Sequence, residues 1–176
     1  MLRVFSLLIV LSLSACGWQL KGSNPGIAQL GSVHLSGDQP NGVVNRAVRT
    51  ELRTSGVEMA ANPKAAQHRI WIGAEDSTLR TASYDALVRA AENTLLMQTD
   101  YELRDGNGKL IAGPNTVYAE RVYEYDVQGV TSSAAQLSII MQELQQRLAE
   151  QIVRQVMAVV NNPAPEPAAN ETVPAR

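Results

Sequence analysis

Apolar and polar residues follow one another in patterns that predict a strand, a helix, three more strands and a final helix. A short alternation over residues 33–35 predicts the first strand. Between Val43 and Thr54 apolar residues recur at the spacing of a helix with one covered face. Asn41 is placed to cap its start, and Gly56 to end it in the left-handed conformation. The apolar positions of this helix are Val44, Ala47, Val48 and Leu52.

The central part of the chain is typical of strands that have one covered face. Residues 68–78 alternate as a strand, whereas residues 79–90 are ambiguous, since their small and polar side chains suit either a continued strand or a loop. Residues 92–104 give the clearest strand pattern, with one apolar face to cover and one polar face for water. The residues expected on the apolar face are Leu95, Met97, Thr99, Tyr101 and Leu103.

A hairpin is predicted at Asp105-Gly106-Asn107-Gly108, because Gly and Asn accept the positive φ that tight turns require. The return strand starts at Lys109 and is interrupted at residues 113–115. It continues from Val117 to Val127, with Arg121 exposed.

The last predicted element is a long amphipathic helix from Ala134 to about Val160. Ser133 and Gln136 fit a capping box at its start. Covering a sheet face is the usual role of such a helix, and a coiled coil or a membrane-surface helix are the alternatives. Its apolar stripe consists of Leu137, Ile140, Met141, Leu144, Leu148, Ile152, Val156 and Val159.

This order of elements predicts an α+β fold, a two-layer sandwich with two helices packed on one face of a mainly antiparallel four-stranded sheet. We expect the domain to span residues 32–160. Residues 161–176 contain four prolines among the last fourteen residues and few large apolar side chains, so they predict a disordered tail.

The N-terminus carries a targeting pattern. Arg3 precedes an apolar run over residues 4–13, which is about half the length that spans a membrane. The sequence Leu13-Ser14-Ala15-Cys16 resembles the bacterial lipobox. That resemblance implies a signal peptide at residues 1–15 and acylation of Cys16, with palmitate among the usual acyl groups, ahead of a lead-in at residues 16–31. Gly17 favours the outer membrane over retention in the inner one. A buried thiol at the end of an uncleaved anchor is the alternative.

Composition limits the chemistry. The chain has 15 Lys plus Arg and 17 Asp plus Glu, and loss of Arg3 with the signal peptide gives 14 − 17 = −3, which argues against a general nucleic-acid binder. Cys16 is the only cysteine, so the monomer forms no disulfide and no thiolate metal site. His34 and His68 lack companion metal ligands, and no Gly-x-Ser-x-Gly motif is present. We therefore expect no cofactor, no metal and no catalytic residues, and a binding or assembly role.

Two motifs carry a family resemblance. Cys-Gly-Trp-Gln-Leu-Lys-Gly at residues 16–22, directly after the lipobox, and Arg-Ala-Val-Arg-Thr-Glu-Leu-Arg-Thr-Ser-Gly-Val at residues 46–57 together resemble the LptE family, the lipopolysaccharide-assembly lipoproteins of Gram-negative outer membranes. The resemblance is good over residues 13–58 and extends in element order to about residue 160. It implies a plug inside the LptD barrel, in a one-to-one complex, that assists barrel folding and binds lipopolysaccharide.

The resemblance also implies a basic site for lipid A phosphates, since guanidinium groups pair with phosphate at two points. The candidates are Arg80 and Arg89, then Lys109 and Arg121. Residues 129–133 ahead of the last helix lack the basic residue that family members carry there. For each arginine the alternative is a solvated surface charge. For the whole protein the alternatives are a glycolipid-binding lipoprotein without a barrel partner and a periplasmic enzyme.

Overall fold

The computed structural model describes residues 27–84, 90–124 and 130–162. The predicted signal peptide, Cys16, Arg89 and residues 163–176 of the predicted tail lie outside these residues. The described elements, in chain order, are α2 (Ile27–Leu30), β1 (Ser32–Gly37), α3 (Val43–Thr54), β2 (Glu58–Met59), the 3-10 helix η1 (Pro63–Ala65), β3 (His68–Ile72), β4 (Asp76–Tyr84), β5 (Ala90–Asp105), β6 (Leu110–Glu124) and α4 (Val130–Asn161).

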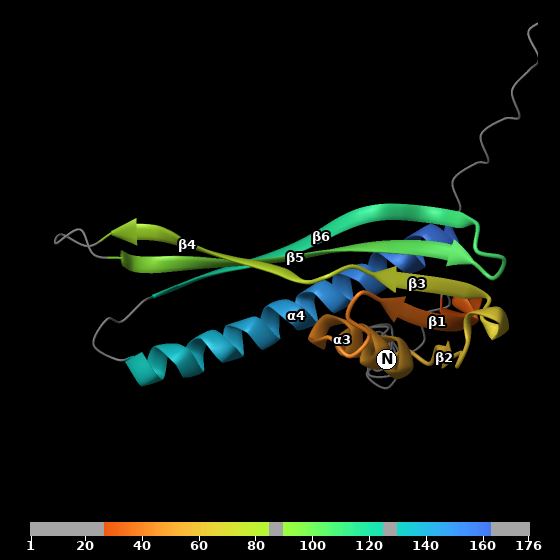
Figure 1. Ribbon diagram of the computed structural model, residues 1–176, viewed down its shortest axis with the longest axis horizontal. Helices are drawn as coiled ribbons and strands as arrows, with labels where there is room; N and C mark the ends of the chain where they lie inside the picture. Colours follow the sequence, from red (N-terminus) through yellow and green to blue (C-terminus); the bar gives the residue numbers. More distant parts are fainter. Residues whose placement is uncertain (1–26, 85–89, 125–129, 163–176) are drawn as a thin grey trace, which may run out of the picture.

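A single mixed sheet forms one layer of the molecule (Figure 1). β1 pairs in parallel with β2 and β3, whereas β5 pairs antiparallel with β3, β4 and β6. The prediction of an α+β fold with an apolar sheet face is confirmed, but the prediction of four strands is wrong, because the sheet has six.

The two strands beyond the predicted four are β4, which a break in the strand separates from β3, and the short β2. β3 and β4 lie one after the other along the same edge of β5, separated at residues 73–75. There the Gly73 N–H donates to the Asp100 carbonyl and the Thr99 hydroxyl donates to the Gly73 carbonyl. The predicted strand over residues 68–78 is therefore broken, and the ambiguous stretch continues as strand up to Tyr84. β2 contributes only two residues beside β1.

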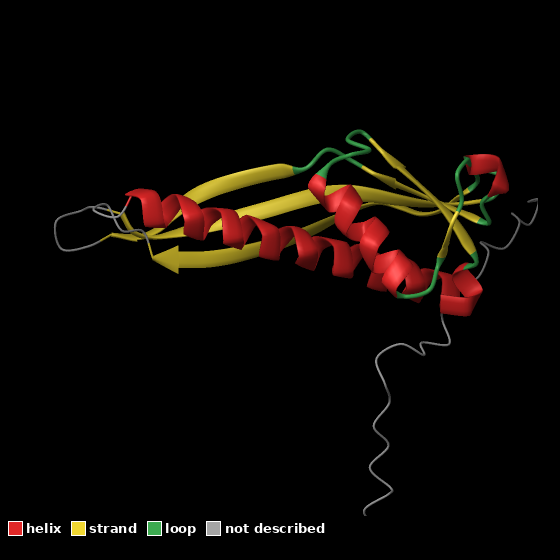
Figure 2. Ribbon diagram, turned by 90° about the horizontal axis from the view of Figure 1, so that it is seen from below, coloured by secondary structure: helices red, strands yellow, loops and turns green. Residues whose placement is uncertain are grey.

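Helices α3 and α4 cover one face of the sheet, here called the helix face, and leave the opposite, open face uncovered by helix (Figure 2). α4 runs along nearly the whole long axis, whereas α3 lies only at the end that holds β1 and β2 (Figure 1). All five predicted core residues of β5 are buried. Among them Tyr101 donates its hydroxyl to Gln155 Oε1 of α4 at 2.7 Å, which links the two layers.

The buried surface of α4 is wider than its predicted stripe. Ala149, Val153 and Met157 are also buried, because the C-terminal half of α4 packs against α3 as well as against the sheet. The helix begins at Val130, so Ser133 lies inside it and the predicted capping box is wrong.

Helix α3 has the predicted bounds but a different cap. Gly42 occupies the N-cap position, so the prediction of Asn41 is wrong. The N–H of Val44, which has no partner within the helix, donates to Glu75 Oε1 at 2.9 Å. Glu75 lies at the break between β3 and β4. Gly56 ends the helix with φ +87°, as predicted.

The predicted hairpin joins β5 and β6. The Gly108 N–H donates to the Asp105 carbonyl, and Gly108 has φ +90°. The predicted interruption of the return strand at residues 113–115 corresponds to an irregularity in its pairing with β5. Tyr101 pairs with Asn115 and Leu103 pairs with Ala112, so the register skips residues 113 and 114, although β6 continues through them as one strand.

Candidate functional site

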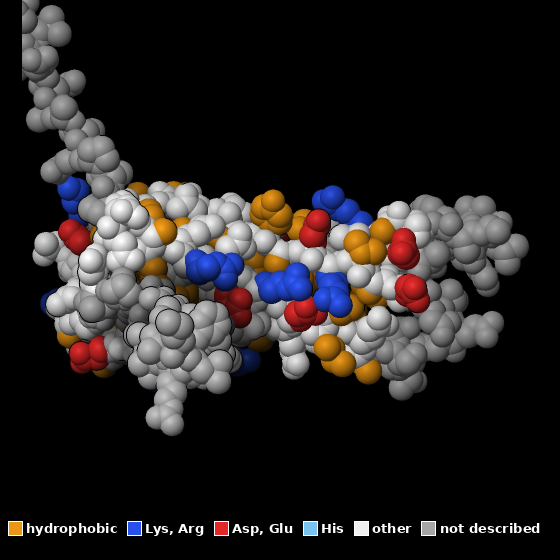
Figure 3. All heavy atoms as spheres, turned by 180° about the vertical axis from the view of Figure 1, so that it is seen from behind, with side chains coloured by type: hydrophobic (Ala, Val, Ile, Leu, Met, Phe, Trp, Pro, Cys, Tyr) orange, Lys and Arg blue, Asp and Glu red, His pale blue; other side chains and the backbone are white. Residues whose placement is uncertain are grey.

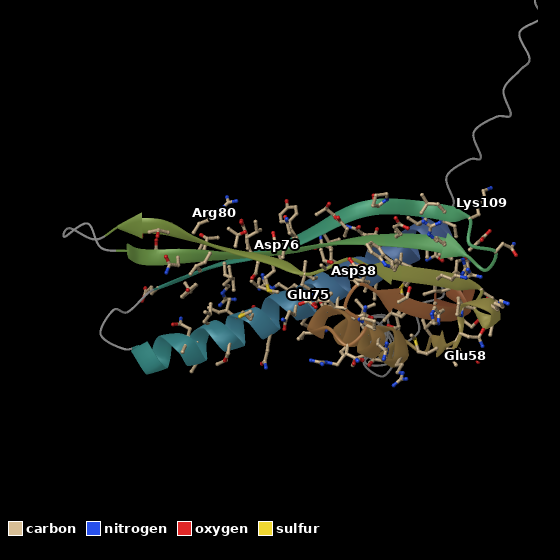
Figure 4. The ribbon with its side chains drawn as sticks, in the orientation of Figure 1. Asp38, Glu58, Glu75, Asp76, Arg80 and Lys109 are labelled. Atoms are coloured by element: carbon tan, nitrogen blue, oxygen red, sulfur yellow. The ribbon has the colours of Figure 1, made fainter. Side chains whose placement is uncertain are left out.

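Arg80 lies on the open face of the distal sheet, which we define as β4 with residues 92–98 of β5 and 118–124 of β6. Cross-strand partners share a face, and Arg80 is in register with Thr94, which is in register with Val122. Arg80 is exposed and points away from α4 (Figure 4). Val122 lies on the same face two strands away, with Thr94 between them, and is 52% exposed.

Two other predicted site residues lie elsewhere. Lys109 sits beside the β5–β6 turn, at the opposite end of the long axis from Arg80 (Figure 4). Arg121 lies on the helix face, in register with Leu95. Its Nη1 donates to both carboxylate oxygens of Glu143 of α4, at 2.8 and 2.9 Å. The structure therefore does not bring Arg80, Lys109 and Arg121 together.

Arg121 belongs to a chain of ion pairs along one flank. Glu143 also accepts from Arg147 at 2.8 Å, and Glu150 lies 3.6 Å from Arg154 one turn further on. Positive and negative side chains alternate along this flank when the molecule is seen from behind (Figure 3). Exposed pairs of this kind are worth little individually. The flank is therefore a charged, solvated surface with its cations already paired.

An open hollow of about 510 Å³ lies between α4 and β6 at the distal end. Arg121 and Glu143 form its polar wall, and Ile139 and Ile140 belong to its apolar wall. Ile139 is 65% exposed, and residues 134–136 and 138 of the same helix are exposed as well. The two layers thus close less completely here than at the end covered by α3.

The described residues were searched for groups of side chains that could bind a metal ion. No group of three or more His, Cys, Asp or Glu side chains in residues 27–84, 90–124 and 130–162 is placed to hold a metal ion. His34 and His68 each direct Nδ1 at a backbone carbonyl, of Ala60 at 3.2 Å and of Leu30 at 2.8 Å. Within the described part of the chain, no helix is both long and apolar enough to cross a membrane.

Comparison with known proteins decides the family. The model of a family described as LptE, lipopolysaccharide-assembly, matches residues 30–156, which are 127 of the chain's 176 residues. The chain belongs to the LptE family. Relatives named LPS-assembly lipoprotein LptE include one from Photorhabdus laumondii, 25% identical over 90% of this chain and 88% of the relative. Another, from Yersinia pestis, is 28% identical over 89% of this chain and 77% of the relative.

Solved structures of lipoproteins share the fold of this LptE-family chain. Rare lipoprotein B from Shewanella oneidensis superimposes with a TM-score of 0.67 at 16% identity, over 75% of this chain and 98% of that chain. A lipoprotein B from Nitrosomonas europaea also gives 0.67, at 18% identity over 83% and 94% of the two chains. At such identities the likeness concerns the fold alone.

Ile139 lies outside the apolar stripe predicted for the last helix, and its exposure agrees with that pattern in this LptE-family domain. The pairing of Arg121 with Glu143 was not predicted, since 22 residues separate them in the sequence. The alternation of β6 does place Arg121 on the same face as the buried Ala119 and Tyr123, and that parity points toward the helix layer.

Proposed function

We propose that this LptE-family protein is an outer-membrane lipoprotein that plugs an LptD-like β-barrel, assists its assembly and binds lipopolysaccharide during insertion into the outer leaflet. The observation that carries the proposal is the family match over residues 30–156, which spans all strands of the sheet and most of α4. This match supports a role in lipopolysaccharide assembly for the folded domain.

Anchoring is proposed through Cys16. The lipobox at residues 13–16 supports cleavage after Ala15 and acylation of the cysteine, and Gly17 supports the outer membrane as the destination. Each buried CH₂ of an acyl chain contributes about 0.8 kcal/mol of membrane affinity, so two or three chains hold a domain firmly. Such a tether keeps the plug beside its barrel.

The plug role is consistent with the shape of the sandwich. α3 and α4 cover one face of the sheet (Figure 2), while the open face carries polar side chains of β5 such as Thr94, Gln98 and Asp100. Isolated apolar side chains interrupt that face, such as Tyr118, which is 63% exposed. A mixed surface of this kind suits contact with a barrel wall across a hydrated lumen, and it needs no catalytic group.

The lipopolysaccharide site is proposed at Arg80 and Arg89. Arg80 stands on the same open face as the exposed Val122, two strands away, so one large ligand can place a phosphate on the first and an apolar chain on the second. Arg121 is already paired with Glu143, and Lys109 lies at the opposite end of the molecule. Both therefore contribute less to the same ligand than the two arginines in and after β4.

Binding of purified lipopolysaccharide to the full-length protein in detergent tests this site. Arg80→Ala with Arg89→Ala should weaken binding about tenfold or more, because two charge-assisted contacts are lost. Arg53→Ala with Arg154→Ala is the matched control, since it removes two exposed charges from the helices. Unchanged binding by the first variant would remove the proposed site.

Depletion of the protein in cells tests the barrel role. Loss of the plug should reduce the amount of assembled barrel and of surface lipopolysaccharide. Normal barrel assembly in depleted cells, with lipopolysaccharide binding intact in vitro, would instead support a general glycolipid-binding lipoprotein without a barrel partner.

A further inference from the structure

A basic cluster lies on the open face at the end of the sheet opposite the distal sheet. Arg69 of β3 is directly in register with Arg104 of β5 and with His34 of β1. Like charges placed directly opposite one another on neighbouring strands destabilise a sheet. A pair of arginines at facing positions is therefore a cost that the fold alone does not require.

Both guanidinium groups are held in place by oxygen atoms. Arg69 donates from Nε to the Pro63 carbonyl at 3.0 Å and from Nη2 to the Gly106 carbonyl. Arg104 donates from Nη1 to the Gly108 carbonyl at 3.2 Å and pairs with Glu102 at 2.7 Å. Since Glu102 is the acidic side chain that faces them, two positive charges meet one negative charge.

Donors remain available in this arrangement. A guanidinium has five N–H groups, and Arg69 uses two in its bonds to carbonyls, so three point elsewhere. Donors fixed before a ligand arrives lose little conformational freedom on binding.

An open hollow of about 480 Å³ surrounds these groups. This volume lies in the range of small-molecule sites, roughly 300 to 1,000 Å³. Trp71, which is in register with Ser36 and Glu102, forms an aromatic wall beside the two arginines.

We propose that this hollow is a binding site for an anionic sugar, with Arg69 and Arg104 holding a phosphate or carboxylate and Trp71 packing against the sugar ring. Guanidinium groups pair with either anion at two points, and the C–H face of a pyranose is apolar enough to bury against an indole. The site is separate from Arg80 and stands without the proposed function. Its ligand can be a free sugar acid or the same group within a glycolipid.

Fluorescence of Trp71 tests the proposal in the full-length protein in detergent. The chain has two tryptophans, so Trp18→Phe leaves Trp71 as the only reporter. Titration with glucose 6-phosphate or glucuronate should give a saturable change, glucose should give none, and inorganic phosphate should bind about tenfold more weakly because it lacks the ring. Absence of a saturable change with both anionic sugars would overturn the proposal.

Substitutions of the two arginines test whether the sugar binds in this hollow. Arg69→Gln with Arg104→Gln should weaken sugar binding about tenfold or more. Arg46→Gln with Arg53→Gln removes equal charge from α3 and should change nothing. Binding that survives the first pair, or a hexaglutamate peptide that binds more tightly than either sugar, would overturn the proposal. If the variant with both substitutions does not fold, the site can be mapped instead by NMR chemical-shift changes in the Trp18→Phe protein on addition of the sugar. We expect changes confined to β1, β3 and β5, and changes confined to other elements would contradict the proposal.

Titration with lipopolysaccharide separates this hollow from the site proposed at Arg80 and Arg89. Lipopolysaccharide should alter Trp71 fluorescence even in Arg80→Ala with Arg89→Ala if its sugars reach the hollow. Sugar binding with no response to lipopolysaccharide would assign the hollow to free sugar acids. Failure of the Arg80 and Arg89 site leaves the Trp71 titration unaffected.

Discussion

The contact between Glu75 and the start of α3 gives a quantitative test of how the two layers are joined. Val44 N–H is one of the helix-initial N–H groups that have no partner within the helix. The Glu75 carboxylate accepts from it at 2.9 Å across 31 residues of sequence. Gly42 leaves room for this carboxylate, because a Cβ there would stand 2.9 Å from Glu75 Oε1.

Glu75→Ala removes both a cap and a negative charge from the positive end of the helix dipole. Loss of a cap costs about 0.5–2 kcal/mol, and loss of the charge costs about 0.3–1 kcal/mol. Glu75 is partly exposed, so water screens its charge and the full sum of the two ranges is not expected. We expect a decrease of about 1–2 kcal/mol in the free energy of unfolding. Glu75→Gln keeps an acceptor oxygen and should cost only the charge contribution.

Urea unfolding followed by circular dichroism measures these differences, with an unchanged m-value as the sign that only stability has altered. Glu58→Ala on β2 is the control, since Glu58 is exposed and its removal should stay within about 0.5 kcal/mol. If Glu75→Ala costs no more than Glu58→Ala, the capping role assigned to Glu75 is wrong.

Three further predictions concern packing and backbone. Leu148→Ala should lower the free energy of unfolding by about 2–5 kcal/mol, because Leu148 is fully buried. Ile139→Ala on the same helix should lower it far less, because Ile139 is exposed. Equal effects of the two substitutions in a denaturant titration would contradict the burial of Leu148. In a double-mutant cycle, Tyr101→Phe and Gln155→Met should show a coupling of about 1 kcal/mol from their 2.7 Å hydrogen bond, and additive effects would refute it. Gly56→Ala should cost about 1 kcal/mol, since φ is +87° and no atom lies within 4 Å of the new Cβ; thermal unfolding without a shift would exclude that strain.

The sheet and helices were predictable where one periodicity decided them. The alternation in β5 identified its buried face correctly, and the bounds of α3 matched, since in both cases the local pattern agrees with the final packing. The break at residues 73–75 was not predictable from alternation, because it depends on bonds to Asp100 and Thr99 from another strand. The Glu75 cap was missed for the same reason.

The candidate site was less predictable than the fold. Basic residues can be counted from the sequence, but their partners depend on register. Arg121 is bonded to Glu143 of α4, and Arg69 faces Arg104 only because β3 pairs with β5 in one particular register. Neither Arg69 nor Arg104 lies in a motif that marks it.

The proposed complex with a β-barrel can be tested by affinity purification of the lipidated protein from its own membranes in mild detergent, followed by measurement of the mass of the intact complex. We predict one copy of the protein bound to one copy of a β-barrel of the LptD type, and loss of membrane attachment with Cys16→Ala. Recovery of the lipidated protein alone, with no barrel retained under conditions that preserve other membrane complexes, would show that the protein is not a barrel plug.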